Sequence, residues 1–235
     1  MEMRNGYMQT DIGIIPNEWK VSNIIENSTL KARIGWQGLT TAEYLVNGNY
    51  LLVTGTDFNE GEISWDTCHY VSKLRYDQDK NIQISDDDIL VTKDGTIGKV
   101  AFIKNLPSPA TLNSGVFVIR PKNGSYVPQY LFYVFNSIYF RDFLRKLVAG
   151  STINHLYQKD FISFNFPLPP TKQEQTAIAK VLSDTDELIF SLEKLIEKKK
   201  LIKQGTMQQL LTGKKRLPGF SGEWEIRKLK DIVEI

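Results

Sequence analysis

The chain has 235 residues, of which 41% are hydrophobic and 24% are charged, with 29 basic and 27 acidic side chains. This apolar share is enough to form a core, which argues against an intrinsically disordered chain. A net charge of +2 is too small to hold nucleic acid by charge alone, although it allows a local basic face. A single cysteine, Cys68, excludes an intramolecular disulfide and fits a reducing compartment, so we expect a cytoplasmic protein.

Metal sites and membrane segments are not expected. The two histidines, His69 and His155, and one thiol exclude the common structural zinc sites, and we expect no cofactor. No apolar run reaches the length of about 18 residues that a membrane span needs. The first residues, MEMRNGYMQTDIG, lack the apolar stretch of a secretion signal.

Strands and turns are predicted in the first part of the chain, and helices follow. Residues rich in β-branched side chains and punctuated by glycine predict strands in 50–58, 88–104 and 113–121. From Val127 to Leu147 the apolar residues recur three or four positions apart, which predicts helical structure. We therefore expect residues 1–170 to form one mixed domain of the α+β class.

A long helix is predicted directly after Pro169 and Pro170. Thr171 and Glu174 form the T-x-x-E pattern of a capping box behind these two helix-excluding prolines. Gly213 is expected to end the helix, because glycine is the usual residue just past a helix C-terminus. The second segment of the chain is thus 171–213.

Apolar side chains form a coiled-coil-like stripe along this helix, interrupted at Thr185, Lys199 and Thr206. At ~1.5 Å per residue the helix is a rod of roughly 60 Å, too long for one small domain to cover. Folding back onto its own domain is one alternative, and pairing with a helix of another chain is the one we favour. The residues expected at that dimer interface are Ile178, Val181, Leu182, Leu188, Leu192, Leu195 and Ile202.

A short motif built around Glu-Trp occurs twice. Residues 14–24 and 220–229 both contain E-W-x-(Val/Ile)-x-x-(Ile/Leu), with the glutamates at Glu18 and Glu223. The motif recurs on either side of a complete domain and helix, which predicts a duplicated unit. We therefore expect 214–235 to be the start of a second repeat.

Enzyme motifs are missing. The chain contains no G-x-G pair and no Walker phosphate loop, which removes the usual dinucleotide and nucleotide sites. The carboxylates of 86–88 are best explained as a turn before a strand. Cys68 and His69 are adjacent but have no third partner, so a catalytic dyad is not expected. We expect a protein without catalysis of its own.

Two segments resemble parts of the specificity subunit of type I restriction-modification systems. They are P-L-P-P-x-x-Q-E-Q in 167–175 and L-L-T-G-K-K-R-L-P-G-F in 210–220, and the two Glu-Trp motifs lie outside them. RIGWQGLTTAEY in 33–44 and GSTINHL in 150–156 are also similar to pieces of that family's target-recognition domains. The resemblance covers essentially the whole chain.

The resemblance implies a function in DNA recognition. Members of this family usually carry two target-recognition domains, each followed by a helix, and the two helices pack antiparallel. Each domain reads one half of a bipartite site in double-stranded DNA. Modification subunits methylate adenine, and restriction subunits translocate and cleave DNA.

The chain contains one such domain and one such helix. We therefore expect a homodimer through 171–212 that reads an inverted repeat. One alternative is a coiled-coil interaction adaptor whose globular domain binds protein, and another is a truncated remnant of a longer specificity subunit.

Candidate DNA-binding residues lie on three predicted loops. Arginine and glutamine suit guanine and adenine as bidentate partners, and lysine or hydroxyl groups suit phosphates. Each group also has an alternative without DNA contact. Residues 31–40 could be a solvated loop, residues 93–99 a plain hairpin, and His155 a structural histidine. A basic run from Lys194 to Arg216 is either a solvated helix face or a further contact with DNA or modification subunits. The candidates are Lys31, Arg33, Gln37, Lys93, Thr96, Lys99, Ser151, Thr152, Asn154 and His155.

Overall fold

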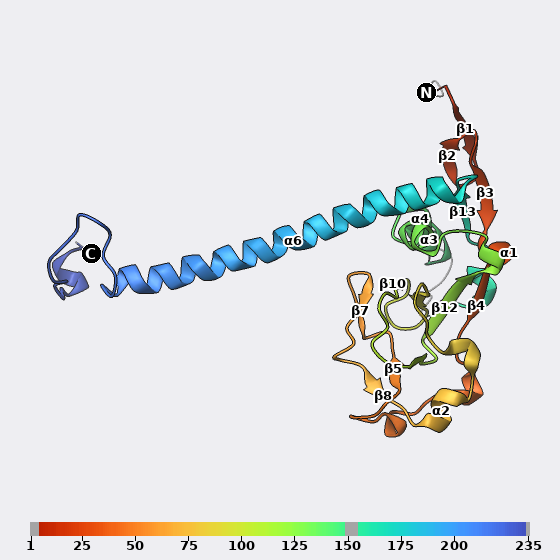
Figure 1. Ribbon diagram of the computed structural model, residues 1–235, viewed down its shortest axis with the longest axis horizontal. Coiled ribbons are helices and arrows are strands. Elements are labelled where there is room, and N and C mark those ends of the chain that lie inside the picture. The colour runs from red at the N-terminus through yellow and green to blue at the C-terminus, as the bar shows by residue number, and fades with distance from the viewer. Residues whose placement is uncertain (1–4, 149–154, 234–235) are drawn as a thin grey trace. The chain divides into compact units, whose positions relative to one another are not determined.

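The computed structural model describes residues 5–148 and 155–233 (Figure 1). It divides into two compact units, Met1–Leu182 and Ser183–Ile235, which we treat separately. Strands and short helices make up most of the first unit, and helix α6 (Lys172–Leu211) begins in the first unit and continues into the second. The predicted α+β class with a long C-terminal helix is confirmed.

A four-stranded antiparallel sheet forms the centre of the first unit, in the order β10-β9-β12-β4. The strands are β4 (Ser28–Lys31), β9 (Ile89–Thr92), β10 (Val100–Phe102) and β12 (Val116–Pro121). Strands β9 and β10 pair antiparallel on either side of the turn that contains Asp94 and Gly95. Strand β12 pairs with β9 along one edge and with β4 along the other.

Both faces of this sheet are buried, and its strands β9 and β10 are buried at every position. Ile89 and Val91 belong to one core cluster, whereas Leu90 between them belongs to the other. Phe117 and Val118 alternate in the same way along β12. This period of two is what a pleated strand gives when each face packs against another layer.

Aromatic helices cover the first face. They are α3 (Pro128–Phe135), α4 (Ile138–Val148) and α5 (Gln158–Phe161). Pro128 occupies the first turn of α3, where its missing N–H has no helical partner to lose. Phe135, Phe140, Phe161 and Phe164 pack ring against ring between these helices and the sheet.

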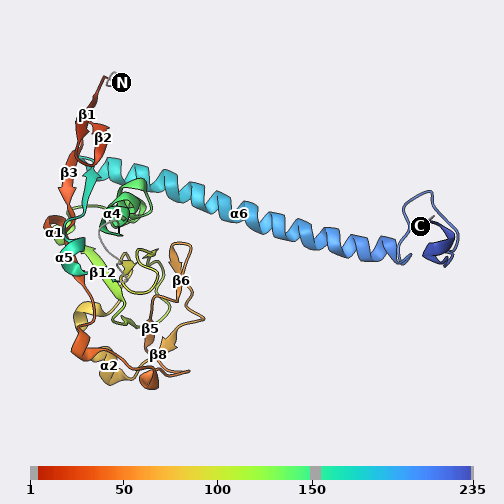
Figure 2. The ribbon, with the colours of Figure 1, turned by 180° about the vertical axis from the view of Figure 1, so that it is seen from behind.

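A three-stranded sheet contributes to the second core cluster, in the order β11-β5-β8. Its strands are β5 (Leu51–Val53), β8 (His69–Tyr70) and β11 (Ala110–Leu112), with the hairpin β6 (Phe58–Asn59) and β7 (Glu62–Ile63) beside β10. Helix α2 (Lys73–Asp77) follows β8. Figures 1 and 2 show α2 at the end of this unit opposite the start of α6.

The N-terminal strands lie beside the start of α6. Strands β1 (Tyr7–Thr10) and β2 (Gly13–Pro16) form a hairpin, β3 (Lys20–Asn23) pairs with β13 (Asn165–Leu168), and helix α1 (Ile24–Asn27) follows β3. The remaining short elements are the 3-10 helices η1 (Gly35–Gln37), η2 (Thr41–Glu43), η3 (Lys80–Ile82), η4 (Lys122–Gly124) and η5 (Leu229–Asp231).

The start of α6 is fixed by two contacts. The Thr171 hydroxyl accepts a hydrogen bond from the Glu174 N–H at 3.2 Å, which is one half of the predicted capping box. The Glu174 carboxylate accepts from the indole N–H of Trp19 at 3.0 Å. The tryptophan of the first Glu-Trp motif therefore helps to fix the start of the helix that follows its own domain.

The two Glu-Trp motifs differ in structure. The first contains strand β3, and Ile24 at its end is fully buried. In the second, Ile226 is fully exposed and Leu229 is 71% exposed. Trp224 lies against Gly213 in the second unit, and the two motifs therefore share a sequence pattern without sharing an environment.

Candidate nucleic-acid interface

Arg33 follows β4, and its side chain lies inside the first unit with 1% of its surface exposed. Its Nε donates to the Leu112 carbonyl oxygen at 2.8 Å, and its Nη2 donates to Thr111 Oγ1 at 3.2 Å. Burial, followed by the nearby charge of Arg75, lowers the pKa of Arg33. The prediction that Arg33 reads a base is corrected here, because an enclosed guanidinium does not reach a DNA groove.

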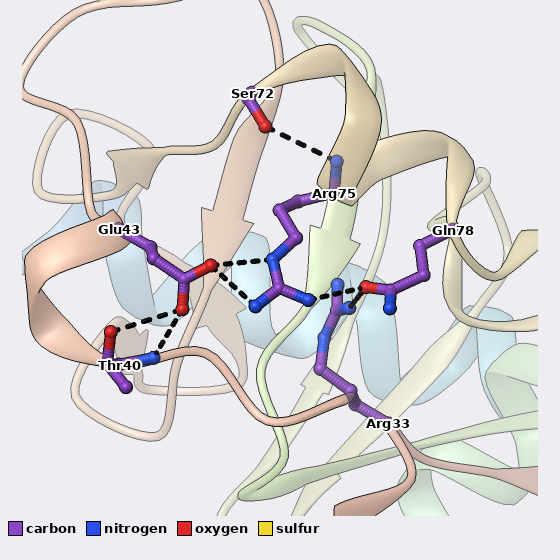
Figure 3. A network of polar contacts seen from close by, with 6 residues as sticks. All are labelled: Arg33, Thr40, Glu43, Ser72, Arg75 and Gln78. Carbon is purple, nitrogen blue, oxygen red and sulfur yellow. Dashed lines mark hydrogen bonds and ion pairs between the residues drawn. The ribbon is translucent and has the colours of Figure 1, made fainter. Parts of the chain in front are cut away.

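A chain of polar contacts runs from Arg33 across α2 (Figure 3). Gln78 Oε1 accepts from Arg33 Nη1 at 3.3 Å and from Arg75 Nη1 at 2.9 Å. Arg75 Nε donates to Glu43 Oε1 at 2.7 Å, and Glu43 Oε2 accepts from the Thr40 N–H at 2.9 Å. The segment between Arg33 and Glu43 is therefore fixed at both ends. Arg33 is bonded to Gln78, the residue after α2, and Glu43 is bonded to Arg75 within α2.

The hydrogen bonds within this chain act on the Glu43 carboxylate. The backbone N–H of Thr40, followed by the Arg75 guanidinium, lowers the pKa of Glu43. The carboxylate therefore stays ionised and also completes a capping box on η2 with Thr40. Helix α2 has its own cap, since Ser72 Oγ accepts from the Arg75 N–H at 3.4 Å.

The other two candidates of this region differ in exposure. Gln37 is 8% exposed, and its Oε1 has no hydrogen-bond partner within the part of the chain that the structure describes. A buried amide does not present its edge to an adenine, so the prediction for Gln37 is corrected as well. Lys31 is exposed at the end of β4 and stays a candidate.

Residues 93–99 form the turn between β9 and β10, and Thr92 fixes its shape. The Thr92 hydroxyl donates to the Thr96 carbonyl oxygen at 2.5 Å and accepts from the Lys99 N–H at 2.9 Å. Gly98 adopts φ +82°, a left-handed conformation that favours glycine. These hydrogen bonds fix the backbone that carries the predicted residues Lys93, Thr96 and Lys99.

The three predicted side chains of this turn reach its surface to different extents. Thr96 is exposed, and Lys93 and Lys99 are half-buried. The Lys93 Nζ lies 5.4 Å from the centroid of the Phe117 ring, a cation–π distance. The turn carries two ammonium groups and one exposed hydroxyl, which suits contacts with phosphates and base edges.

His155 brings a second loop to the same turn. Its Nδ1 is in close polar contact with Asp94 Oδ1, and the Leu156 N–H donates to the Lys93 carbonyl oxygen at 2.7 Å. The His155 ring also lies 4.5 Å from the Tyr157 ring, centroid to centroid. His155 is therefore beside the predicted turn although 56 positions or more separate them in sequence. Ser151, Thr152 and Asn154 lie outside the described residues.

A third loop, 113–115, completes this group. The Lys93 N–H donates to the Gly115 carbonyl oxygen at 2.9 Å, and Asn113 Nδ2 donates to Tyr44 Oη at 2.6 Å. We call residues 93–99, 113–115 and 155–157 the three-loop surface.

Sequence reasoning missed four polar residues of this region: Asp94, Asn113, Tyr44 and Tyr157. The Asp94-Gly95 pair signalled a turn, but nothing in the sequence showed that Asp94 would meet His155. The nearest available signal for Tyr157 was its place in the polar segment 150–160.

The first turns of α6 pack on the first unit. Gln175 is 2% exposed; its Oε1 accepts from the Val127 N–H at 2.8 Å, and its Nε2 donates to the Pro169 carbonyl oxygen at 3.0 Å. Ala179 is buried, and Ile178 packs against the same core. Ile178 is half-buried against its own domain, so less of its side chain is left for the predicted dimer interface than at the residues further along α6.

The remaining apolar residues of the predicted interface are exposed by 39–66%: Val181, Leu182, Leu188, Leu192, Leu195 and Ile202. Exposed apolar side chains repeated at this spacing along one helix are typical of a helix face that packs on another surface. The described residues contain no cluster of three or more His, Cys, Asp or Glu side chains able to hold a metal. Within 5–148 and 155–233, no helix has both the length and the apolar character needed to cross a membrane.

The sequence matches a known protein family. Residues 16–204 match the model of the type I restriction modification DNA specificity domain. This match begins at Pro16, the last residue of β2, and includes the rest of the first unit and most of α6.

Curated relatives are similar over most of the chain. The MjaVIII specificity subunit of Methanocaldococcus jannaschii is 29% identical over 94% of this chain and 55% of its own length. The MjaIX specificity subunit of the same organism is 32% identical over 80% of this chain and 42% of its own length. The EcoKI specificity subunit of Escherichia coli is 21% identical over 86% and 44%. The chain spans about half the length of these relatives.

Solved structures share the fold. A chain from a study of complex assembly and conformational transition in the type I R-M system superposes with a TM-score of 0.60 at 18% identity, over 83% of this chain and 46% of that chain. The S subunit from M. genitalium gives a TM-score of 0.56 at 14% identity, over 80% and 44%. From the extent of the family match we conclude that the chain belongs to the family of type I restriction-modification DNA specificity domains.

Proposed function

We propose that the chain is the DNA-recognition component of a type I restriction-modification complex and has no catalysis of its own. The family match over residues 16–204 is the observation that carries this proposal. In this role the chain selects the site in double-stranded DNA, modification subunits methylate adenine there, and restriction subunits cleave DNA.

The three-loop surface is the part of the first unit that we propose for base and phosphate contacts. Its loops stand on a sheet buried on both faces, and binding residues are commonly placed on loops that a rigid scaffold positions. Lys93, Lys99 and His155 supply donors, and Asn113 supplies both a donor and an acceptor. Lys31 is a candidate for a phosphate contact outside this surface.

We also propose that two copies of the chain pair through α6 and read an inverted repeat. The exposed apolar stripe from Val181 to Ile202 supports pairing, because a helix in water buries such a stripe against a second helix. A two-fold symmetric pair presents two identical reading surfaces, so each half-site has the same sequence.

A binding experiment tests the recognition proposal. The chain is purified with a modification subunit and used to select ligands from a random DNA pool, followed by gel shift with the selected sequence. We expect a bipartite motif and a clear preference for it over random DNA at the same salt concentration. Equal binding to all sequences would contradict the proposal.

Light scattering tests the pairing proposal. At micromolar concentration the 235-residue chain is expected at twice its mass of 26.9 kDa. A single-chain mass across this range would contradict the homodimer while leaving the recognition proposal in place.

A further inference from the structure

Asn113 stands where the chain passes from one sheet to the other. It directly follows β11, and its backbone N–H donates to the carbonyl oxygen of Val53, the last residue of β5, at 2.9 Å. Val116 then begins β12, which pairs with β9. Leu112 and Val116 on either side of the turn are fully buried. The backbone of Asn113 is therefore fixed by both sheets, and a rigid support of this kind suits a residue that contacts a ligand.

The side-chain amide of Asn113 is held as well, by one hydrogen bond at each end. Its Oδ1 accepts from the Ser114 N–H at 2.7 Å, and its Nδ2 donates to Tyr44 Oη at 2.6 Å. A backbone N–H can only donate, so the Ser114 contact identifies which end of the amide is the oxygen. The amide is therefore half-buried in one defined orientation.

These two contacts use half of the hydrogen-bonding capacity of the amide. An amide oxygen has two lone pairs, and an amide nitrogen has two hydrogens. The bonds to Ser114 and Tyr44 use one lone pair and one hydrogen. One acceptor site and one donor are left, side by side on a planar group.

Adenine is the base whose major-groove edge fits this remaining pair. It presents the N7 acceptor next to the N6 amino donor, whereas guanine presents two acceptors, cytosine one donor, and thymine one acceptor beside a methyl group. An asparagine therefore makes two hydrogen bonds with adenine and fewer with the other three bases.

The charge beside this turn favours a base edge over a phosphate. A Cβ on Gly115 would lie 3.4 Å from Asp94 Oδ2, so the Asp94 carboxylate lies against the same turn as Asn113. Like charges placed together across an interface disfavour association. A neutral base edge is free of this repulsion, whereas a phosphate is not.

We propose that Asn113 reads an adenine in the major groove, its Nδ2 donating to N7 and its Oδ1 accepting from the N6 amino group, and that Tyr44 holds the amide in this orientation. This inference rests on the proposed function and adds the base and the residue that reads it. Tyr44 is a positioning residue, because it acts through Asn113. Burial raises the pKa of the Tyr44 phenol, so its Oη stays a neutral partner for the amide.

Base analogues test this contact with the full chain in complex with a modification subunit. DNA is first selected from a random pool, and each adenine of the selected motif is then replaced singly by 7-deazaadenine, which lacks the N7 acceptor. We expect one adenine of a half-site at which this replacement weakens binding about tenfold. In Asn113→Ala the same replacement is expected to change binding less than about twofold, because the contact has already been removed.

Asn113→Asp gives a second readout that unfolding cannot imitate. An aspartate still accepts from the Ser114 N–H and accepts from the Tyr44 hydroxyl, but it has no donor for the adenine N7. Cytosine offers its N4 amino group to a carboxylate. We therefore expect the preferred base at this position to change from adenine to cytosine.

Two further variants test the positioning role and the background. Tyr44→Phe removes the Oη that accepts from Asn113, and we expect the effect of 7-deazaadenine at the same adenine to fall to about threefold. The control is Asn17→Ala, an exposed asparagine directly after β2, for which the effect is expected to stay at about tenfold. An undiminished effect in Tyr44→Phe would overturn the positioning role of Tyr44.

The outcomes separate this inference from the proposed function. A selected motif that Asn113→Ala leaves unchanged, or in which no adenine responds to 7-deazaadenine, would overturn the adenine contact while leaving DNA recognition in place. An equal loss of binding by Asn113→Ala on all sequences would overturn it as well, since a structural role has that effect. An unsubstituted chain that selects no motif would overturn both.

Discussion

Arg33 donates three hydrogen bonds from inside the first unit, to Leu112, Thr111 and Gln78. Hydrogen bonds to a charged group contribute about 1.5–3 kcal/mol each, but burial of the guanidinium offsets much of that gain. Removing the side chain leaves the carbonyl oxygen of Leu112 without this donor. The role of Arg33 is therefore to fix the segment before η1 in place.

We expect Arg33→Met to lower the free energy of unfolding by about 2–4 kcal/mol, because it removes a buried, hydrogen-bonded charge. Chemical denaturation measures this change. The control is Lys31→Ala, an exposed position where the change is expected to stay within about 0.5 kcal/mol. A stable Arg33→Met variant with an altered preference at one base pair would instead restore the base-reading role.

The pKa of Glu43 predicts a pH effect on stability. The folded pKa lies below the unfolded value of about 4.3, so the ionised carboxylate stabilises the fold above that value. This stabilisation is lost as the pH falls through the unfolded pKa toward the folded one. Unfolding measured from pH 6 down to pH 3 is expected to show a smaller loss of stability for Glu43→Gln. An identical pH profile for both chains would contradict the proposed contact with Thr40 and Arg75.

Within single elements, alanine substitution is expected to have opposite effects on stability at Gly98 and at Gly205. A Cβ at Gly98 would lie 2.3 Å from the Leu144 Cδ1, and its φ is positive, whereas Gly205 lies within α6 with no atom within 4 Å of an added Cβ. We expect Gly98→Ala to destabilise the first unit by about 2 kcal/mol. Gly205→Ala is expected to stabilise α6 by about 0.5–1 kcal/mol. Thermal unfolding followed by circular dichroism measures both, and the same sign for the two variants would contradict this account.

The turn 93–99 makes a prediction about DNA binding. We expect Lys99→Ala to weaken binding similarly for all sequences and to reduce the slope of log K against log salt by about one, as the loss of one phosphate contact does. The matched control is Lys104→Ala, an exposed lysine after the other end of β10, which is expected to leave the slope unchanged. A change in base preference for Lys99→Ala would assign it a base contact, and no change at all would remove the turn from the interface.

Hydrophobic periodicity predicted the elements well, because β12 and α6 carry their periods over enough residues to be unambiguous. It could not separate Ile178 from Leu188, which share one stripe, since only tertiary packing half-buries the first and leaves the second exposed. Residue type could not predict that Arg33 is buried either. An arginine before a polar loop gives the same sequence signal whether its side chain faces a DNA groove or the core of the domain. The pairing of Asp94 with His155 depends on which loops the sheet brings together.

At the scale of the whole molecule, side-chain hydrogen bonds hold the start of α6 against the domain that precedes it. Trp19 bonds to Glu174, and Gln175 bonds to Val127 and Pro169, so the helix begins on the domain that precedes it in sequence. The loops of the three-loop surface come from other parts of the first unit. The proposed reading residues can therefore change without disturbing the proposed pairing of α6.

Mapping of methylated sites in cells that express this chain with its modification subunit tests the central claim most directly. Residues 20–165 are exchanged for the same region of another family member, and α6 is kept. We predict that the methylated motif changes in both half-sites while the complex still assembles. An unchanged motif after this exchange would contradict the claim that this domain reads the DNA sequence.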